Sequence, residues 1–276
     1  MPNQDVTASW DAFCDTLKAA GKELTDPAVP TDSQTQAEGL RYLSRMARAA
    51  LEWYVEFNDP EFPVLYQPAH ETIKLGADNP DNLYQKAVID GRFDYVVRGE
   101  RGSIDYISFA TSKGSYAENF TQIETGFLDS NTIDISEDGS FEIVLSSREQ
   151  PGNWLPMDEA SESLLIRQTY LDRSQETAAT ISIQRADSTA VPTPLSVDTI
   201  SVNFEKAMAF YRNTIGLFSR WSQQIREKPN SLLLWDQSFC QAVGGDPNIL
   251  YYHGHFRLQS DEIMVITLPS VPKCQT

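Results

Sequence analysis

Two histidines and an arginine occupy alternate positions within residues 251–258, a spacing that could bring their side chains together for catalysis or metal binding. His253, His255 and Arg257 would share one face of a strand, because successive side chains of a strand point to opposite faces. We interpret these three residues as candidate catalytic groups. Two imidazoles at this spacing can bind one zinc or iron ion, with a carboxylate such as Glu262 as third ligand. The spacing to Glu262 does not match the usual jelly-roll metal motif, and a solvated polar face is the plainer interpretation. The alternative third ligands are Asp261 and His70.

A second group of side chains could line a cavity for an apolar molecule. Aromatic residues are frequent in the chain, at 11%, and core packing is their ordinary role. A cavity between the inner face of a sheet and the helices that cover it is nevertheless the default ligand site of a mixed fold. The candidate ligand-binding residues are Trp154, Tyr170, Arg167, Tyr95, Tyr106 and Tyr84.

Several common kinds of site have no motif here. The sequence contains no nucleophile elbow, no P-loop and no glycine-rich dinucleotide fingerprint. Cys14, Cys240 and Cys274 form no C-x-x-C pair, so the pattern supports neither a zinc knuckle nor a redox site. The 39 acidic residues make chance carboxylate pairs common. No cofactor can therefore be named from the sequence.

The net charge of the protein limits which partners it can bind. The formal net charge of -17 opposes nucleic acid and anionic membranes, because both attract basic proteins. The sequence shows neither a signal peptide pattern nor an apolar run long enough to span a bilayer. Widely spaced free cysteines are typical of a reducing compartment. We therefore expect a soluble cytoplasmic protein with an apolar small molecule as its partner; homo-oligomerisation stays open.

Apolar residues at helical spacing predict elements that could position these groups. A stripe from Val6 to Leu24 indicates one helix, and another runs from about Gln36 to Phe57. Asn79-Pro80 is typical of a helix start and predicts a short helix over Asp81–Ile89. A long helix follows the cap residue Ser196 and ends near residue 228.

Alternation with a period of two predicts the strands. Two hairpins are expected, one from 93–97 and 104–109 around Gly99–Gly102, the other from 132–136 and 141–146 around Asp138-Gly139. Further strands are expected at 164–171, 180–184, 251–258 and 263–268. Short strands joined by turns favour an antiparallel sheet folded into a sandwich or jelly roll.

These elements predict an α+β fold, with an antiparallel β-sandwich or jelly-roll-like core and helices from both ends of the chain packed on it. Residues 1–60 would be an N-terminal helical segment and residues 61–190 the β-sandwich domain. Residues 191–276 would supply the long helix and the terminal strands that complete the same globule.

Three stretches carry a family resemblance. They are Asp78-Asn79-Pro80-Asp81-Asn82-x-Tyr84, Asp94-Tyr95-x-x-x-Gly99 with Tyr106-x-Ser108-Phe109, and Asn153-Trp154-Leu155-Pro156 with Arg167-x-x-Tyr170. Over about residues 76–172 the chain resembles the bacterial family catalogued as domain of unknown function 1214. It departs from that family at Asp172, where a proline is frequent. The resemblance implies a β-sandwich, jelly-roll-like fold but no reaction, since the family has no established common activity. Because relatives often occur in bacteria that process lipids, steroids or aromatics, it also implies an apolar ligand.

The expected function is therefore to bind or convert a hydrophobic small molecule, of lipid, steroid, terpenoid or aromatic type, in a cavity between sheet and helices. Two alternatives remain open at this point. One is a metal-dependent enzyme that uses His253 and His255, and the other is a structural or accessory subunit without catalysis.

Overall fold

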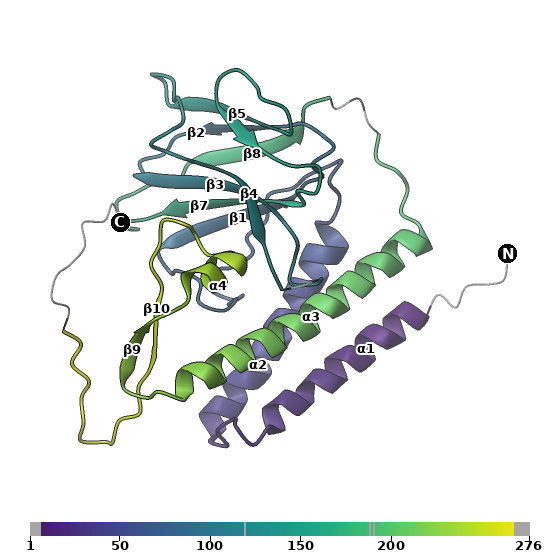
Figure 1. Ribbon diagram of the computed structural model, residues 1–276. Helices are drawn as coiled ribbons and strands as arrows, with labels where there is room; N and C mark the ends of the chain where they lie inside the picture. The colour runs from purple at the N-terminus through teal and green to yellow at the C-terminus, as the bar shows by residue number, and fades with distance from the viewer. Residues whose placement is uncertain (1–6, 119, 188, 190, 268–276) are drawn as a thin grey trace.

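Two β-sheets stack on one side of the molecule, and the long helices lie on the other (Figure 1). The computed structural model describes residues 7–118, 120–187, 189 and 191–267. The strands of the first sheet are β1 (Asn82–Val88), β3 (Tyr106–Lys113), β4 (Ile123–Asp129) and β7 (Ser163–Thr169). The strands of the second sheet are β2 (Tyr95–Glu100), β5 (Ser140–Ser146), β6 (Trp154–Pro156) and β8 (Thr180–Arg185). A separate two-stranded sheet pairs β9 (Ser231–Leu234) with β10 (Tyr252–His255).

The helices come from both ends of the described chain. The N-terminal ones are α1 (Ala8–Ala20), the 3-10 turn η1 (Gly21–Thr25), α2 (Ser33–Leu51) and the π-helical turn η2 (Glu52–Glu56). The C-terminal ones are α3 (Val197–Arg226) and α4 (Gln237–Ala242). Because α3 packs against α1, α2 and η2, segments far apart in sequence form one helical layer.

The first sheet has the order β1-β7-β3-β4, with antiparallel neighbours throughout. In the β1–β7 register Tyr84 lies opposite Arg167, and Lys86 lies opposite Leu165. Residues opposite each other in a ladder project to the same face. These four side chains therefore share one face of the sheet.

The other face of this sheet packs against the second sheet, whose order is β6-β5-β2-β8. Ile107, Phe109 and Ile166 from the first sheet join Val97 and Ile143 from the second in one buried apolar cluster. Burying an Ile or Phe side chain contributes roughly 1.5–3 kcal/mol of transfer free energy. This shared cluster is what holds the two sheets together.

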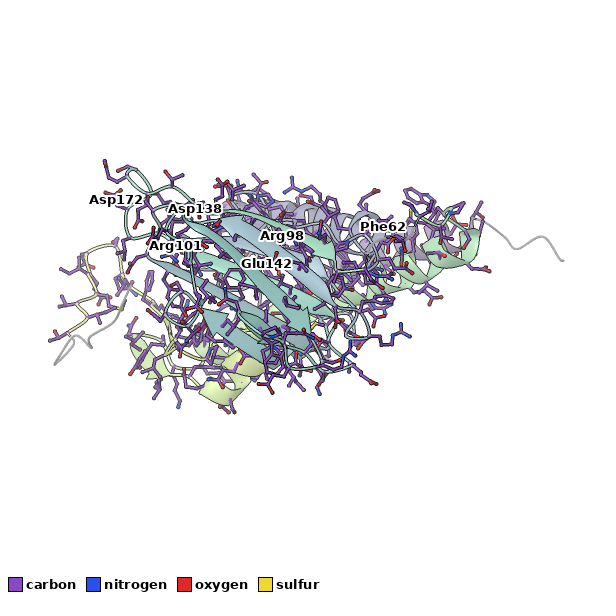
Figure 2. All side chains as sticks on the ribbon, turned by 90° about the horizontal axis from the view of Figure 1, so that it is seen from above. Phe62, Arg98, Arg101, Asp138, Glu142 and Asp172 are labelled. Carbon is purple, nitrogen blue, oxygen red and sulfur yellow. The ribbon has the colours of Figure 1, made fainter. Side chains whose placement is uncertain are left out.

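The second sheet turns its outer face to solvent. Arg98 of β2 and Glu142 of β5 lie side by side there (Figure 2), with Arg98 Nε donating to Glu142 Oε2 at 2.8 Å. Each side chain is about half exposed, so the pair contributes little to stability. Two cavities lie on the helix-facing side of the first sheet.

The helical layer has its own apolar cluster. Ser196 caps α3 by accepting a hydrogen bond from the Thr199 N–H at 3.1 Å, as its sequence position predicts. Phe210, Tyr211 and Ile215 of α3 are buried against α2 and η2 residues, among them Trp53. The three long helices predicted from the apolar stripes are thus confirmed, with shifts of a few residues at their ends.

The prediction of a helix over Asp81–Ile89 is wrong, because β1 occupies this segment. Asn79 forms a turn, not a helix cap: its side-chain oxygen accepts the Asp81 N–H at 2.9 Å. Lys86 then exchanges backbone hydrogen bonds with Tyr66 at 2.8 and 2.9 Å, and the whole strand pairs with β7. Pairing with distant strands outweighs the local helix-start signal.

The first predicted hairpin is also wrong. Strands β2 and β3 follow one another in sequence but lie in different sheets. Gly99 belongs to β2 instead of a turn, and the Phe141 ring across the ladder would lie 2.4 Å from a Cβ at this position. The glycine therefore marks close packing between strands and not a reversal of the chain.

The second predicted hairpin forms only in part. Gly139 has the positive φ of 85° expected of its turn, and β5 begins at Ser140. Residues 132–136 are not a strand, because the side chain of Asn153 binds the Asp134 backbone at 2.7 and 2.9 Å. Strand β5 pairs with β2 and β6 instead.

The C-terminal pairing differs from the prediction as well. β10 lies within the expected 251–258 strand, but its partner is β9, which the sequence pattern did not indicate. Residues 263–267 form no strand, and Leu268 lies outside the described residues. β4 and β6 were likewise not predicted, whereas β7 and β8 agree with their predictions.

The fold class is confirmed as mixed α+β, with largely antiparallel sheets and covering helices. Within the part of the chain that the structure covers, no helix combines the length and apolar character needed to cross a membrane.

Candidate functional site

The helix-facing side of the first sheet is lined by alternate residues of β1 and β7. Tyr84, Lys86, Leu165 and Arg167 lie on it, whereas the neighbouring residue Ile166 enters the core between the sheets. This alternation follows from the two-residue period of a strand. The sheet therefore presents two basic side chains, Lys86 and Arg167, and two uncharged ones, Tyr84 and Leu165, to the helices.

We call the space above these residues the aromatic cavity, which encloses about 210 Å³. It lies between β1 and β7 on one side and η2, α3, α4 and β10 on the other. The side chains that line it are mainly aromatic or apolar, as is usual for small-molecule pockets. The aromatic ones are Trp53, Tyr84, Tyr116, Phe218, Trp221 and Tyr251, together with the imidazole of His253.

A second space, which we call the polar cavity, encloses about 370 Å³ beside the first. The two cavities share Trp53 and Lys86 as lining residues. Several charged side chains line the polar cavity, among them Glu118, Glu162 and Lys206. Lys86 and Trp53 therefore stand where an apolar space meets a polar one.

Trp53 lies on the π-helical turn η2, which continues directly from α2. A π turn adds a residue to the helical repeat and changes the direction in which the following side chains point. The Trp53 ring is buried against Phe210, with 4.8 Å between ring centroids, and against Tyr66. This packing fixes one wall that both cavities share.

Lys86 has a perturbed amine. Its side chain is half-buried, and loss of hydration lowers its pKa to about 8, partly opposed by the negative charge of Glu162. Among the described residues its Nζ has no ion-pair or hydrogen-bond partner. Unlike Trp53 Nε1, this atom is not fully enclosed by protein, so it borders open space. A perturbed, unpartnered amine in a cavity is a candidate functional group.

Arg167 is already neutralised by its surroundings. Its side chain is 8% exposed and that of Asp246 is 2% exposed, with Nη1 and Oδ2 separated by 3.7 Å. Arg167 Nη2 also donates to the Gly244 carbonyl oxygen at 2.6 Å. The Asp246 N–H in turn donates to Tyr251 Oη at 2.8 Å. Arg167 thus fastens the loop after α4 over the sheet.

His253 lies among aromatic rings. Its ring centroid is 5.0 Å from that of Trp221 and 5.6 Å from that of Trp235. Burial lowers the pKa of His253, which favours the neutral imidazole, and its Nε2 has no hydrogen-bond partner among the described residues. Within the same described residues, the indole nitrogens of Trp53 and Trp221 also lack partners. Unpaired buried polar atoms around one cavity are the kind of exception that a bound molecule or water explains.

Three of the residues predicted from the sequence meet in the aromatic cavity: Tyr84, Arg167 and His253. The other predicted ligand-binding residues do not line this cavity. Tyr95 is buried between the sheets, and its hydroxyl donates to the Pro60 carbonyl oxygen at 2.9 Å. Trp154 Nε1 donates to the Ser146 carbonyl oxygen at 3.0 Å. The Arg173 guanidinium lies over the Tyr170 ring, 4.3 Å from the ring centroid. Tyr106 is half-buried on β3 and does not line the aromatic cavity.

His253 and His255 both lie on β10, but the predicted third ligand Glu262 lies beyond the strand. His255 lies at the end of β10 opposite Ser231, and Glu262 Oε2 accepts the Gln259 N–H at 2.9 Å in a local turn. Arg257 exchanges hydrogen bonds with Asn230, beyond the strand. No group of three His, Cys, Asp or Glu side chains within the described ranges could hold a metal ion. The metal site gains no geometric support and stays a prediction.

Lys86, Trp53 and Trp221 are cavity residues that the sequence analysis missed. The signal was present in β1, where Tyr84, Lys86 and Val88 alternate with Leu83, Gln85 and Ala87. The helix-start pattern at Asn79-Pro80 concealed it. A lysine on the same strand face as Tyr84 would otherwise have been a candidate.

Comparison with solved structures gives a strong match. The solved structure of an uncharacterised protein from Burkholderia cenocepacia is 47% identical, covering 92% of this chain and 71% of that chain with a TM-score of 0.90. A protein from Vibrio parahaemolyticus is 15% identical, covering 67% of this chain and 53% of that chain, and its TM-score of 0.32 supports no comparison. Neither a family profile nor a curated protein matches the chain. The resemblance to domain of unknown function 1214 stays a prediction.

Proposed function

We propose that this chain, which belongs to the same family as the uncharacterised Burkholderia cenocepacia protein, binds a hydrophobic small molecule in the aromatic cavity. The observation that carries the proposal is the cavity itself. A space of about 210 Å³ lies between a sheet face and the covering helices, and aromatic rings from separate elements converge on it. This is where a mixed fold ordinarily holds a small apolar ligand.

The electrostatics of the cavity favour a neutral ligand. Arg167 is paired with Asp246 and cannot offer a full positive charge to a bound anion. The chain carries a net charge of -17, which repels anions in solution. Apolar molecules with at most one neutral polar group fit these conditions. Molecules of aromatic, terpenoid, steroid or lipid type are the chemical classes we propose.

The finer fold assignment belongs to this proposal. Two sheets that share one apolar cluster support a β-sandwich arrangement, with the ligand outside the sandwich, between one sheet and the helices. Such a placement leaves the core between the sheets intact when the cavity fills. The free thiols Cys14 and Cys240 support a reducing, cytoplasmic setting, which is likewise part of the proposal.

A binding experiment with a matched pair of variants tests the function. Cinnamyl alcohol serves as a neutral apolar probe, and calorimetry gives its dissociation constant. Leu165→Phe adds volume inside the aromatic cavity, whereas Leu171→Phe makes the same change at a side chain that is 60% exposed. We expect Leu165→Phe to weaken binding at least tenfold and Leu171→Phe to leave it within twofold.

Two results would overturn the proposal: no detectable probe binding by the unaltered protein, or equal binding by both variants. Native mass spectrometry of the protein purified without chelator would complement the assay. A retained apolar molecule would identify the ligand class directly, and its loss in Leu165→Phe would place it in the aromatic cavity.

A further inference from the structure

We infer that Lys86 captures the aldehyde or ketone group of an apolar ligand as an imine, so that the aromatic cavity is a carbonyl-binding site. The inference rests on the proposed function, because the aromatic cavity must first hold the apolar body of the ligand. It adds a covalent step and a named nucleophile that apolar binding alone does not require.

The position of Lys86 is the first support. Its side chain leaves the middle of β1 opposite Leu165 and lines both the aromatic and the polar cavity. The strand holds its backbone rigidly, since Lys86 is paired to β7 and exchanges hydrogen bonds with Tyr66. The amine is thus fixed at the boundary between an apolar space and a wet one, within reach of a ligand in either.

The state of the amine is the second support. Its Nζ has no ion-pair or hydrogen-bond partner in the described part of the chain and borders open space. Burial lowers its pKa to about 8 from the ordinary 10.5, which raises the neutral fraction near pH 7. Only the neutral amine has a lone pair to donate, and desolvation is a known way to activate a lysine towards carbonyl compounds.

The charged groups that face Lys86 come from several elements. In the polar cavity they are Asp90 and Arg92 after β1, Glu118 after β3, Glu159 and Glu162 before β7, and Lys206 of α3. In the aromatic cavity they are Asp78 and Arg167. Asp78 is paired with Lys74 at 3.0 Å, and Arg167 is paired with Asp246. Glu162 is the charge that acts on the amine most directly.

The chemistry balances without any oxidant or reductant. The neutral amine nitrogen forms a bond to the carbonyl carbon as the C=O π bond breaks, and one of its N–H protons passes to the carbonyl oxygen. The carbinolamine then loses its hydroxyl group, with a proton, as water while the nitrogen lone pair forms the C=N bond, and loss of the second N–H proton gives the neutral imine. Glu162, whose pKa is raised by desolvation and by the charge of Glu118, can carry protons in these steps. The polar cavity offers the released water a way out.

An anionic ligand held by the ammonium of Lys86 is the competing interpretation, and the surroundings oppose it. The space around Lys86 is also lined by the carboxylates of Glu118, Glu159 and Glu162. The other positively charged groups that line it are the amine of Lys206 and the guanidinium of Arg92. A bound anion would meet this acidic wall as well as the negative net charge. A neutral carbonyl meets neither cost.

Reductive trapping tests the inference on the full-length protein. Cinnamaldehyde is added with sodium cyanoborohydride at pH 7.0, and each of the eight lysines is assayed by peptide mass spectrometry. A pKa of about 8 against an ordinary 10.5 corresponds to a neutral fraction about 300-fold larger. We expect Lys86 to be labelled at least 30-fold faster than Lys113, which is paired with Asp158 on the surface. Peptide mapping also separates Lys86 from any α-amino group.

Variants and a second probe keep the outcomes distinct. Lys86→Arg retains the charge and Lys86→Met the apolar stem; neither can form an imine, so both should lose the trapped adduct. Lys113→Arg should keep it. Cinnamyl alcohol, which has no carbonyl group, should bind but never be trapped.

Binding of cinnamyl alcohol without trapping at Lys86 would overturn the imine and leave the proposed function standing. Failure of both probes to bind would overturn both. Binding of cinnamate in preference to the aldehyde and the alcohol would overturn the imine in favour of anion binding. Labelling spread evenly over the lysines would also refute the inference.

Discussion

Replacing Lys86 by methionine should stabilise the folded protein at neutral pH. The pKa of Lys86 is lowered to about 8 in the fold against 10.5 in an exposed chain, so folding disfavours the ammonium form. The difference of 2.5 pKa units corresponds to about 3 kcal/mol at 1.36 kcal/mol per unit. Methionine keeps an apolar stem of similar length and carries no charge to bury.

The two pKa values of Lys86, in the folded and in the unfolded state, determine how the stability of the wild type changes with pH. Below pH 8 both states hold the proton, and the full cost of about 3 kcal/mol is present. Between pH 8 and 10.5 the unfolded chain binds the proton while the folded protein has lost it, so the stability of the wild type rises with pH. At pH 9.5, one unit below the unfolded value, roughly half of this cost remains.

Urea denaturation of the wild type and Lys86→Met at pH 7.0 and pH 9.5 measures this directly. We expect the variant to be more stable by about 3 kcal/mol at pH 7.0 and by about half as much at pH 9.5. Lys113→Met, at a surface ion pair, should change stability by at most about 1 kcal/mol. A Lys86→Met variant that is less stable than the wild type at pH 7.0, or an advantage independent of pH, would refute the reasoning. A stabilising substitution at a cavity residue is also the pattern expected where a residue is retained for function.

Three further predictions concern stability. Asp246→Ala should lower the free energy of unfolding by about 3 kcal/mol in chemical denaturation, because Arg167 stays buried without its partner. The double variant Arg167→Met/Asp246→Leu should recover much of that loss, and a double variant whose loss equals the sum of the two single losses would contradict this. Gly76→Ala should lower the free energy of unfolding by at least about 1 kcal/mol, since φ at Gly76 is +61° and the new Cβ would lie 2.3 Å from the Phe218 ring. The melting temperature should fall, and an unchanged melting temperature would count against the prediction. Ser196→Ala should cost about 1 kcal/mol through loss of the α3 cap, while Ser196→Asp should restore it.

Local sequence patterns were sufficient for the three long helices but indicated neither the short helix α4 nor the strand β1. The stripe of α3 and its cap at Ser196 follow from a 3.6-residue period and from the hydrogen bond that a serine side chain makes to the first turn. The strands β7 and β8 also follow from the local alternation of their residues. In these elements local preference and tertiary packing agree.

Pairing between distant strands could not be predicted in the same way. Gly99 and Asp138-Gly139 both have the composition of turns, yet only the second is one, because the Phe141 ring packs against Gly99 from the neighbouring strand. The helix-start signal at Asn79 was likewise overruled by the β1–β7 ladder. Such outcomes depend on partners far away in sequence, which no local pattern contains.

The sequence by itself determined the α+β class, the three long helices and the chemical character of Tyr84, Arg167 and His253 as candidate site residues. Only the tertiary structure decided that these three residues meet, and that Lys86, Trp53 and Trp221 join them. The reason is physical: the cavity forms where strands, a π-helical turn and a distant helix come together. The perturbed amine of Lys86 arises from that enclosure and not from the residues beside it in the chain.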